Sequence, residues 1–266
     1  MDFYKVRWGL SMTILEAILL GVLEGATEFL PISSTGHLIL GSHLLAIPET
    51  PFLTSFLIAI QLGAIGAVIV TYWRSFLDFQ ILKRLFAAFV PTAVIGFALY
   101  KLIKGYLLGN EWIVVIALLV GGILLIVFEL LHKERDGGAE TIGAIRYRDA
   151  VAIGLFQALA IVPGVSRSAA SIAGGLLLGI RRVAIVEFSF LLAVPTMLAA
   201  TGYDLLKTYD TFEAGNISLL LIGAATAFAV ALVALRFLLR FVKTYTFIPF
   251  GIYRIVLALV FLIFVL

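Results

Sequence analysis

The sequence contains no cysteine and little charge, because Asp, Glu, Lys and Arg together make up only 13% of its 266 residues. The absence of cysteine excludes a disulfide framework and any metal site built on thiolates, and it leaves the compartment undetermined. The net charge of +3 is modest, and nothing in the sequence resembles the basic footprint of a nucleic-acid-binding protein. We therefore expect no nucleic-acid partner.

Hydrophobic residues dominate the chain, with a share of 62% and a mean hydropathy of +1.15. Such a composition is typical of an integral protein of the lipid bilayer, where about 20 apolar residues cross as one helix. The sequence predicts an all-α polytopic membrane protein that forms a single membrane domain, 1–266. Six transmembrane helices are expected at 52–73, 85–103, 112–131, 183–203, 217–236 and 246–265.

Two polar stretches interrupt this apolar pattern. The first is EGATEFLPISSTGHL at 24–38, where Glu24 and Glu28 share one helix face and Pro31 disfavours helix at the preceding residue. The second is IVPGVSRSAAS at 161–171. Exposing either loop to lipid would be costly, since unsatisfied polar groups in hydrocarbon cost several kcal/mol each. The two loops are therefore expected to form one shared site.

The chain also repeats itself at about half its length. PISS at 31–34 is matched by PGVS at 163–166, and SFLIA at 55–59 is matched by SFLLA at 189–193. The segments 12–47 and 149–180 are too short to cross the membrane twice, so each is predicted to be a re-entrant helix pair. Three spans in each half require inverted-topology repeats, at about 1–133 and 134–266.

The positive charges predict an orientation. Loops 74–84, 132–148, 181–182 and 236–243 hold twelve Lys and Arg, whereas the N-terminal tail and loops 101–111 and 205–216 hold five. The twelve-charge side is expected to be cytoplasmic, and the first polar loop then enters from the outer side.

The second loop is suited to an anion. A glycine-containing turn ahead of a helix presents backbone N–H groups, and Arg167 adds a planar pair of donors. An intramembrane phosphate implies a lipid that carries it. The candidate substrate-binding residues are Ser33, Gly164, Ser166, Arg167, Ser168 and Ser171.

The carboxylates of the first loop have a different chemistry. Glu24 and Glu28 are expected either to bind a divalent cation, Mg²⁺ or Ca²⁺, or to serve as bases. Ser34 and His37 would supply a nucleophile and a proton donor or acceptor, and the residues leave open which of the two attacks phosphorus. For the remaining charges at membrane depth, the structural interpretation is that Arg254 pairs with Glu187 or Glu16 to hold helices together.

These motifs resemble the bacterial undecaprenyl-diphosphate phosphatases of the bacitracin-resistance type, through EGATEFLPISSTGH, PGVSRSAAS and EFSFLLAVPTM at 187–197. The resemblance covers essentially the whole chain. It implies active-site roles for Glu24, Glu28, Ser34, His37, Ser166 and Arg167, with Glu28, Ser34, His37 and Arg167 as the candidate catalytic residues. Two positions depart from the family pattern, Ala169 in place of the usual Gly and Ser171 in place of Thr.

The resemblance also implies hydrolysis of undecaprenyl diphosphate to undecaprenyl phosphate and inorganic phosphate, which recycles the lipid carrier for peptidoglycan synthesis. It implies a divalent cation and the bacterial cytoplasmic membrane, and a homodimer is one further expectation. The type-2 phosphatidic acid phosphatases are excluded, because no histidine follows His132. A transporter or flippase of a phosphorylated lipid is the alternative, since inverted repeats with broken helices also build transporters. A non-catalytic lipid-binding scaffold is disfavoured by the number of buried ionisable groups.

Overall fold

The computed structural model describes residues 12–99, 107, 110–134, 137–208 and 217–264. Within these residues every regular element is helical and no strand forms, so the predicted all-α class is confirmed. The described ranges also contain three short 3₁₀ helices, η1 (Ser75–Leu77), η3 (Ile142–Ala144) and η4 (Leu159–Ile161). The α-helices are α1 (Ile14–Thr27), α2 (Ser34–Leu44), α3 (Pro51–Ala59), α4 (Gln61–Thr71), α5 (Phe79–Ala98), α7 (Glu111–Leu131), α8 (Tyr147–Ala158), α9 (Arg167–Leu177), α10 (Arg182–Thr208), α11 (Ile217–Phe241) and α12 (Ile248–Phe264).

Five helical stretches in the described part of the chain are long and apolar enough to cross a membrane: Pro51–Thr71, Phe79–Ala98, Glu111–Leu131, Arg182–Lys207 and Ile217–Phe241. They coincide with five of the six predicted spans, although 100–103 lie outside the described residues. The sixth prediction falls on α12, whose apolar stretch Ile248–Ile263 is shorter than these five. The N-terminal tail and most of loops 101–111 and 205–216, which the orientation prediction uses, lie outside the described residues.

One predicted span is broken. The stretch 52–73 forms two helices, α3 and α4, that meet at Ile60. Thr50 caps α3 by accepting from Leu53 N, and Pro51 occupies the first turn, where its missing N–H costs nothing. The break places the polar side chain of Gln61 at the start of α4.

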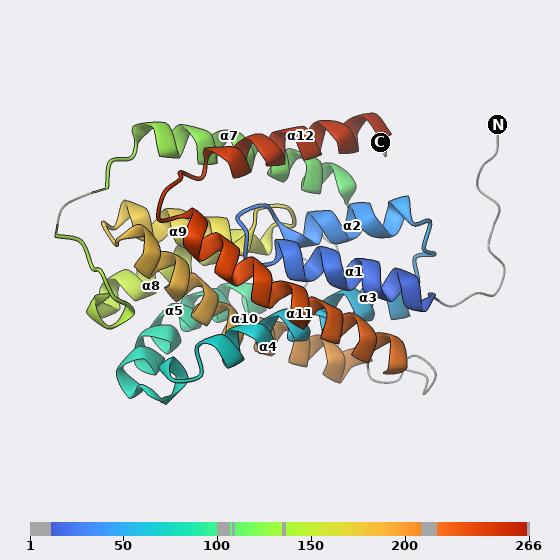
Figure 1. The fold of residues 1–266 in the computed structure, drawn as a ribbon, viewed down its shortest axis with the longest axis horizontal. Helices are drawn as coiled ribbons and strands as arrows, with labels where there is room; N and C mark the ends of the chain where they lie inside the picture. The colour runs from blue at the N-terminus through green and yellow to red at the C-terminus, as the bar shows by residue number, and fades with distance from the viewer. Residues whose placement is uncertain (1–11, 100–106, 108–109, 135–136, 209–216, 265–266) are drawn as a thin grey trace.

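Two helix pairs carry the polar motifs. Helices α1 and α2 form the first pair, and α8 and α9 form the second; Figure 1 shows their connecting turns near the middle of the molecule. Thr13 and Glu16 close a capping box at the start of α1, so that end of the helix is satisfied without solvent.

A helix from each polar pair packs against a long helix from the other half of the chain. Helix α1 packs on α11 and α8 packs on α5, while α7 and α12 lie side by side along one edge of the molecule (Figure 1). Glycine allows the close approach: a β-carbon at Gly154 of α8 would lie 2.0 Å from the carbonyl oxygen of Ala88, and one at Gly25 of α1 would lie 2.4 Å from that of Ala227. The backbones are therefore in direct contact at both places.

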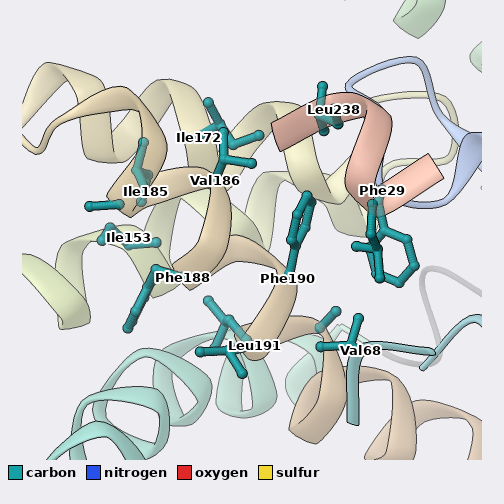
Figure 2. Packing of buried hydrophobic residues seen from close by; sticks show 14 of the residues in the cluster. Phe29, Val68, Ile153, Ile172, Ile185, Val186, Phe188, Phe190, Leu191 and Leu238 are labelled. Carbon is teal, nitrogen blue, oxygen red and sulfur yellow. The ribbon is translucent and has the colours of Figure 1, made fainter. Parts of the chain in front are cut away.

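The largest apolar cluster surrounds α10. Figure 2 shows Phe188, Phe190 and Leu191 of α10 among side chains from α4, α8, α9 and α11. Phe188 and Phe190 are fully buried, and the ring of Phe190 meets Phe29 edge to face with centroids 5.4 Å apart. Phe29 belongs to the first polar turn, so this core fixes that turn against the centre of the fold.

Candidate active site

The two polar turns end in the same way. Ser33 and Ser166 both have a positive φ, a conformation that costs about 1–3 kcal/mol for a residue with a β-carbon. Each serine then caps the following helix, since Ser33 Oγ accepts from Gly36 N and Ser166 Oγ accepts from Ala169 N at 3.2 Å. The turns thus bring the positive ends of α2 and α9 to the site.

A direct hydrogen bond joins the two turns. Ser168 Oγ donates to the carbonyl oxygen of Leu30 at 2.8 Å, and it also lies 3.1 Å from Ser166 Oγ. Residues 138 positions apart in the sequence are therefore held together. The expectation that the two loops form one site agrees with this contact.

Glu28 lies at the centre of the site, between the two halves of the chain. Ser34 Oγ donates to one of its carboxylate oxygens, and Arg167 Nη2 donates to the other at 3.2 Å. Arg167 Nη1 donates to the backbone carbonyl of Ser189 at 2.8 Å, which fixes the plane of the guanidinium. The side chains of Arg167 and Glu28 are only 12% and 6% exposed, so this ion pair is poorly screened.

A pocket opens over this cluster. Ser34 and Arg167 both line it, and Gly164 contributes backbone at φ 92°, where a β-carbon would lie 2.7 Å from the Val114 carbonyl oxygen. Glycine is required there both by conformation and by space. The lining residues are Glu28, Ser33, Ser34, Thr35, Gln61, Ala160, Val162, Pro163, Gly164, Ser166, Arg167 and Met197.

Two predicted binding residues do not line the pocket. Ser168 bonds to Leu30, as described above, and Ser171 Oγ donates to the Arg167 carbonyl and lies 2.7 Å from Ser189 Oγ. Both side chains are fully or almost fully buried. In this structure their hydroxyls bind protein atoms and brace the second turn behind the pocket.

Glu24 is fully buried one turn before Glu28, and it also lies outside the pocket lining. In the described part of the chain neither of its carboxylate oxygens has a hydrogen-bond partner, and its charged neighbours are Glu28 and Arg167. A buried carboxylate without donors needs a cation or a proton. Hard oxygen ligands of this kind are those that Mg²⁺ and Ca²⁺ prefer, so the pair fits a divalent cation. The described residues contain no cluster of three or more His, Cys, Asp or Glu, and a cation here would therefore need further oxygen ligands.

His37 is buried and bonds to Ser33, which lines the pocket. Its Nδ1 lies 2.8 Å from the Ser33 carbonyl oxygen, which can only accept, so Nδ1 carries the proton. Its Nε2 lies 2.8 Å from the hydroxyl of Tyr253 and therefore accepts from it, and the two rings are stacked in parallel. Both ring nitrogens are engaged, and His37 does not line the pocket.

Arg254 does not form the predicted ion pair. Its guanidinium is fully buried and donates to five backbone carbonyls, because α12 carries it directly between the two polar turns and α7. Glu16, one of the expected partners, instead belongs to the capping box of α1. The carbonyls that accept from Arg254 are those of Pro31, Ala117, Leu118, Gly164 and Val165.

Sequence reasoning missed Gln61, Ser189 and Tyr253. Gln61 is a polar residue in the middle of an apolar span, which is a usable signal for a functional position. Ser189 lies within EFSFLLAVPTM and supplies the carbonyl that holds Arg167. Nothing in the sequence around Tyr253 points to His37, which is 216 residues away.

The fold and the site define a helical membrane protein in which serine, glutamate and arginine from two capped turns meet at one pocket. Residues 17–260 match the family described as bacitracin resistance protein BacA, and the chain belongs to this family. It is 51% identical to the undecaprenyl-diphosphatase of Sulfurihydrogenibium sp. over 250 residues, which cover 94% of this chain and 98% of that protein. It is 49% identical to the undecaprenyl-diphosphatase of Aquifex aeolicus over 251 residues, which cover 94% of this chain and 98% of that protein. It is 50% identical to the undecaprenyl-diphosphatase of Persephonella marina over 256 residues, which cover 96% of this chain and 100% of that protein.

Proposed function

We propose that this protein hydrolyses undecaprenyl diphosphate to undecaprenyl phosphate and inorganic phosphate, and so returns the lipid carrier to peptidoglycan synthesis. The observation that carries the proposal is the Ser34–Glu28–Arg167 cluster at the pocket. It combines a nucleophile, a base and a guanidinium that can bind phosphate. Membership of the BacA family and the undecaprenyl-diphosphatase relatives supply the substrate.

Arg167 and the turn before it bind the diphosphate. The guanidinium presents planar donors to phosphate oxygens, and the N-terminus of α9 adds backbone N–H groups and the positive end of the helix dipole. The carbonyl of Ser189 holds Arg167 in place before substrate arrives. The donors are thus arranged for the charge that develops on the transferred phosphoryl group.

Ser34 is the nucleophile in this mechanism. Its Oγ already donates to Glu28, so its proton passes to that carboxylate as the serine oxygen bonds to the terminal phosphorus. The anhydride P–O bond breaks, and undecaprenyl phosphate leaves. The oxygen of a water molecule then bonds to phosphorus and the phosphoseryl bond breaks. The proton held by Glu28 returns to Ser34 Oγ, and both protons of the water leave with inorganic phosphate. His37, with both ring nitrogens occupied, orients the first turn through the Ser33 carbonyl.

Glu24 and Glu28 are the residues that would hold a divalent cation, together with oxygens of the bound diphosphate. When bound, the cation neutralises charge on the diphosphate and on the two carboxylates. The unpartnered oxygens of Glu24 support this assignment.

The finer architecture is part of the same proposal. Helices α1 and α2, with 14 and 11 residues, and α8 and α9, with 12 and 11, are each shorter than the roughly 20 residues that cross a bilayer. We take them as re-entrant pairs of two inverted repeats, and the reciprocal contacts of α1 with α11 and of α8 with α5 support this. The charge asymmetry favours a pocket that opens to the outer side of the bacterial cytoplasmic membrane.

Phosphate release from the purified protein in detergent tests the proposal. With undecaprenyl diphosphate and Mg²⁺ or Ca²⁺, the wild type should release one equivalent of inorganic phosphate, and Ser34→Ala should release almost none. Ser42→Ala is the matched control, because Ser42 lies on the same helix and its hydroxyl donates to the Ile39 carbonyl outside the pocket. Binding of the lipid without phosphate release would indicate a scaffold, and transfer of intact lipid between vesicle leaflets without release would indicate a flippase.

A further inference from the structure

In the described part of the chain, the hydrogen bonds of the Arg254 side chain reach both polar turns and α7. Nη1 donates to the carbonyls of Pro31 at 3.4 Å and Val165 at 3.0 Å, and Nη2 donates to those of Gly164 at 2.9 Å and Ala117 at 3.0 Å. Residues from the start, the middle and the end of the chain therefore meet at a single guanidinium.

Two of the three turn carbonyls that Arg254 holds, those of Pro31 and Gly164, stand at equivalent positions. Pro31 lies two residues before Ser33, and Gly164 lies two residues before Ser166. These serines cap the helices that carry Ser34 and Arg167. Holding these two carbonyls therefore fixes the distance between the starts of α2 and α9. It thereby also fixes the distance between Ser34 and Arg167.

We propose that Arg254 is a positioning residue that sets the spacing of the two polar turns and thereby aligns Ser34 with Arg167. The inference rests on the proposed phosphatase function. Arginine suits the task because its rigid planar fork carries five N–H donors, whereas a lysine ammonium is a compact group with three. Carbonyl oxygens within turns also need such donors, since no helix supplies them.

The packing of α7 on α12 is built around this guanidinium. A β-carbon at Gly121 of α7 would lie 2.1 Å from Arg254 Nη2, and one at Gly122 would lie 2.7 Å from the carbonyl oxygen of Gly251. The two helices thus approach closely and leave room for the arginine alone. Any larger residue at 121 would displace the guanidinium from the turns.

The test compares turnover with a distance. We expect Arg254→Met to lower kcat for phosphate release by about 100-fold, the size of effect that a displacement of about 1 Å causes, with KM changed little. Because the chain has no cysteine, spin labels at Thr35→Cys and Leu159→Cys, next to the first and second turn, report the turn spacing. Arg254→Met should broaden this distance distribution. Arg254→Lys, which keeps the charge but loses the fork, should lower kcat by about tenfold or more.

The matched control is Arg182→Met, which removes a partly exposed arginine from its ion pair with the buried Glu129, away from the pocket. It should lower thermal stability and leave both kcat and the label distance unchanged. Normal turnover in Arg254→Lys, or an unchanged distance distribution in Arg254→Met, would overturn the inference. If Arg254→Met does not fold, the Lys variant decides through the same two measurements. A wild type that releases no phosphate would refute the proposed function, while the distance measurement would still decide the role of Arg254.

Discussion

Ser33 and Ser166 adopt the same backbone conformation in the two halves of the chain, with φ of 71° and 73°. The likeness continues to the far end of each helix pair, where Ile47 N donates to the Ser42 carbonyl and Ile180 N donates to the Gly175 carbonyl, both at 3.0 Å. Each of these pairs of positions is separated by half the length of the chain, so the same turn and the same helix end have been built twice.

The cap at Ser166 gives a prediction about stability. Ser166→Ala should lower the free energy of unfolding by about 1–2 kcal/mol, because it removes the cap of α9 and keeps a β-carbon at positive φ. Ser166→Gly should lower the free energy of unfolding by only a few tenths of a kcal/mol, since glycine accepts this φ without strain. Reversible unfolding in mixed micelles measures both, and equal losses would show that the positive φ imposes no strain on a residue with a β-carbon.

Arg167 gives a prediction about chemistry. Arg167→Lys keeps a charge beside Glu28 but cannot also reach the Ser189 carbonyl as a planar fork, so kcat should fall by about 100-fold. Arg167→Ala should be nearly inactive. Steady-state phosphate release gives kcat, and the melting temperature should change little for the lysine variant. Near-normal turnover in that variant would mean that a point charge is sufficient.

The two carboxylates give a prediction about the cation. Glu24→Gln and Glu28→Gln should each shift half-activation to a higher Mg²⁺ or Ca²⁺ concentration, because each removes a charged oxygen ligand. Ser34→Ala should lower turnover without moving that midpoint. Glu129→Gln is the control, since Glu129 is a buried carboxylate paired with Arg182 and lies outside the pocket.

A different result would separate the roles of the carboxylates. If Glu28 acts only as the base for Ser34, then Glu28→Gln lowers turnover at every cation concentration and leaves the midpoint in place. That result would show that Glu28 does not bind the divalent cation, and Glu24 would be the remaining carboxylate of the proposed cation site. A fully active Ser34→Ala would pass the nucleophile role to another group.

The orientation is testable with single cysteines in this cysteine-free chain. Gly143 is exposed with nothing within 4 Å of an added β-carbon, and Glu49 is exposed between α2 and α3. In intact cells an impermeant thiol reagent should label Glu49→Cys and leave Gly143→Cys unlabelled until the membrane is opened. The reverse pattern would place the pocket on the cytoplasmic side.

The local part of the site was predictable from sequence, because Pro31, the glycines and the clustered hydroxyls are signals that act over a few residues. The apolar runs likewise predicted the five long apolar helical stretches of the described residues, one of which is broken at Ile60. The partners were not predictable. Arg254 was expected to meet a carboxylate and instead meets carbonyls, one of them 223 residues away. At the break between α3 and α4, neither Ile60 nor its immediate neighbours Ala59 and Gln61 is proline or glycine, so the residues at the break do not predict it.

The duplicated turn has a consequence for stoichiometry. Moving on from Ser34 by half the length of the chain leads to Arg167, so under the proposed repeat the proposed nucleophile and the arginine proposed to bind phosphate occupy equivalent positions in the two halves. Two identical half-chains joined about a twofold axis would offer either two serines or two arginines at the pocket. A single polypeptide that contains both halves escapes this restriction, and its one pocket can hold one residue of each kind.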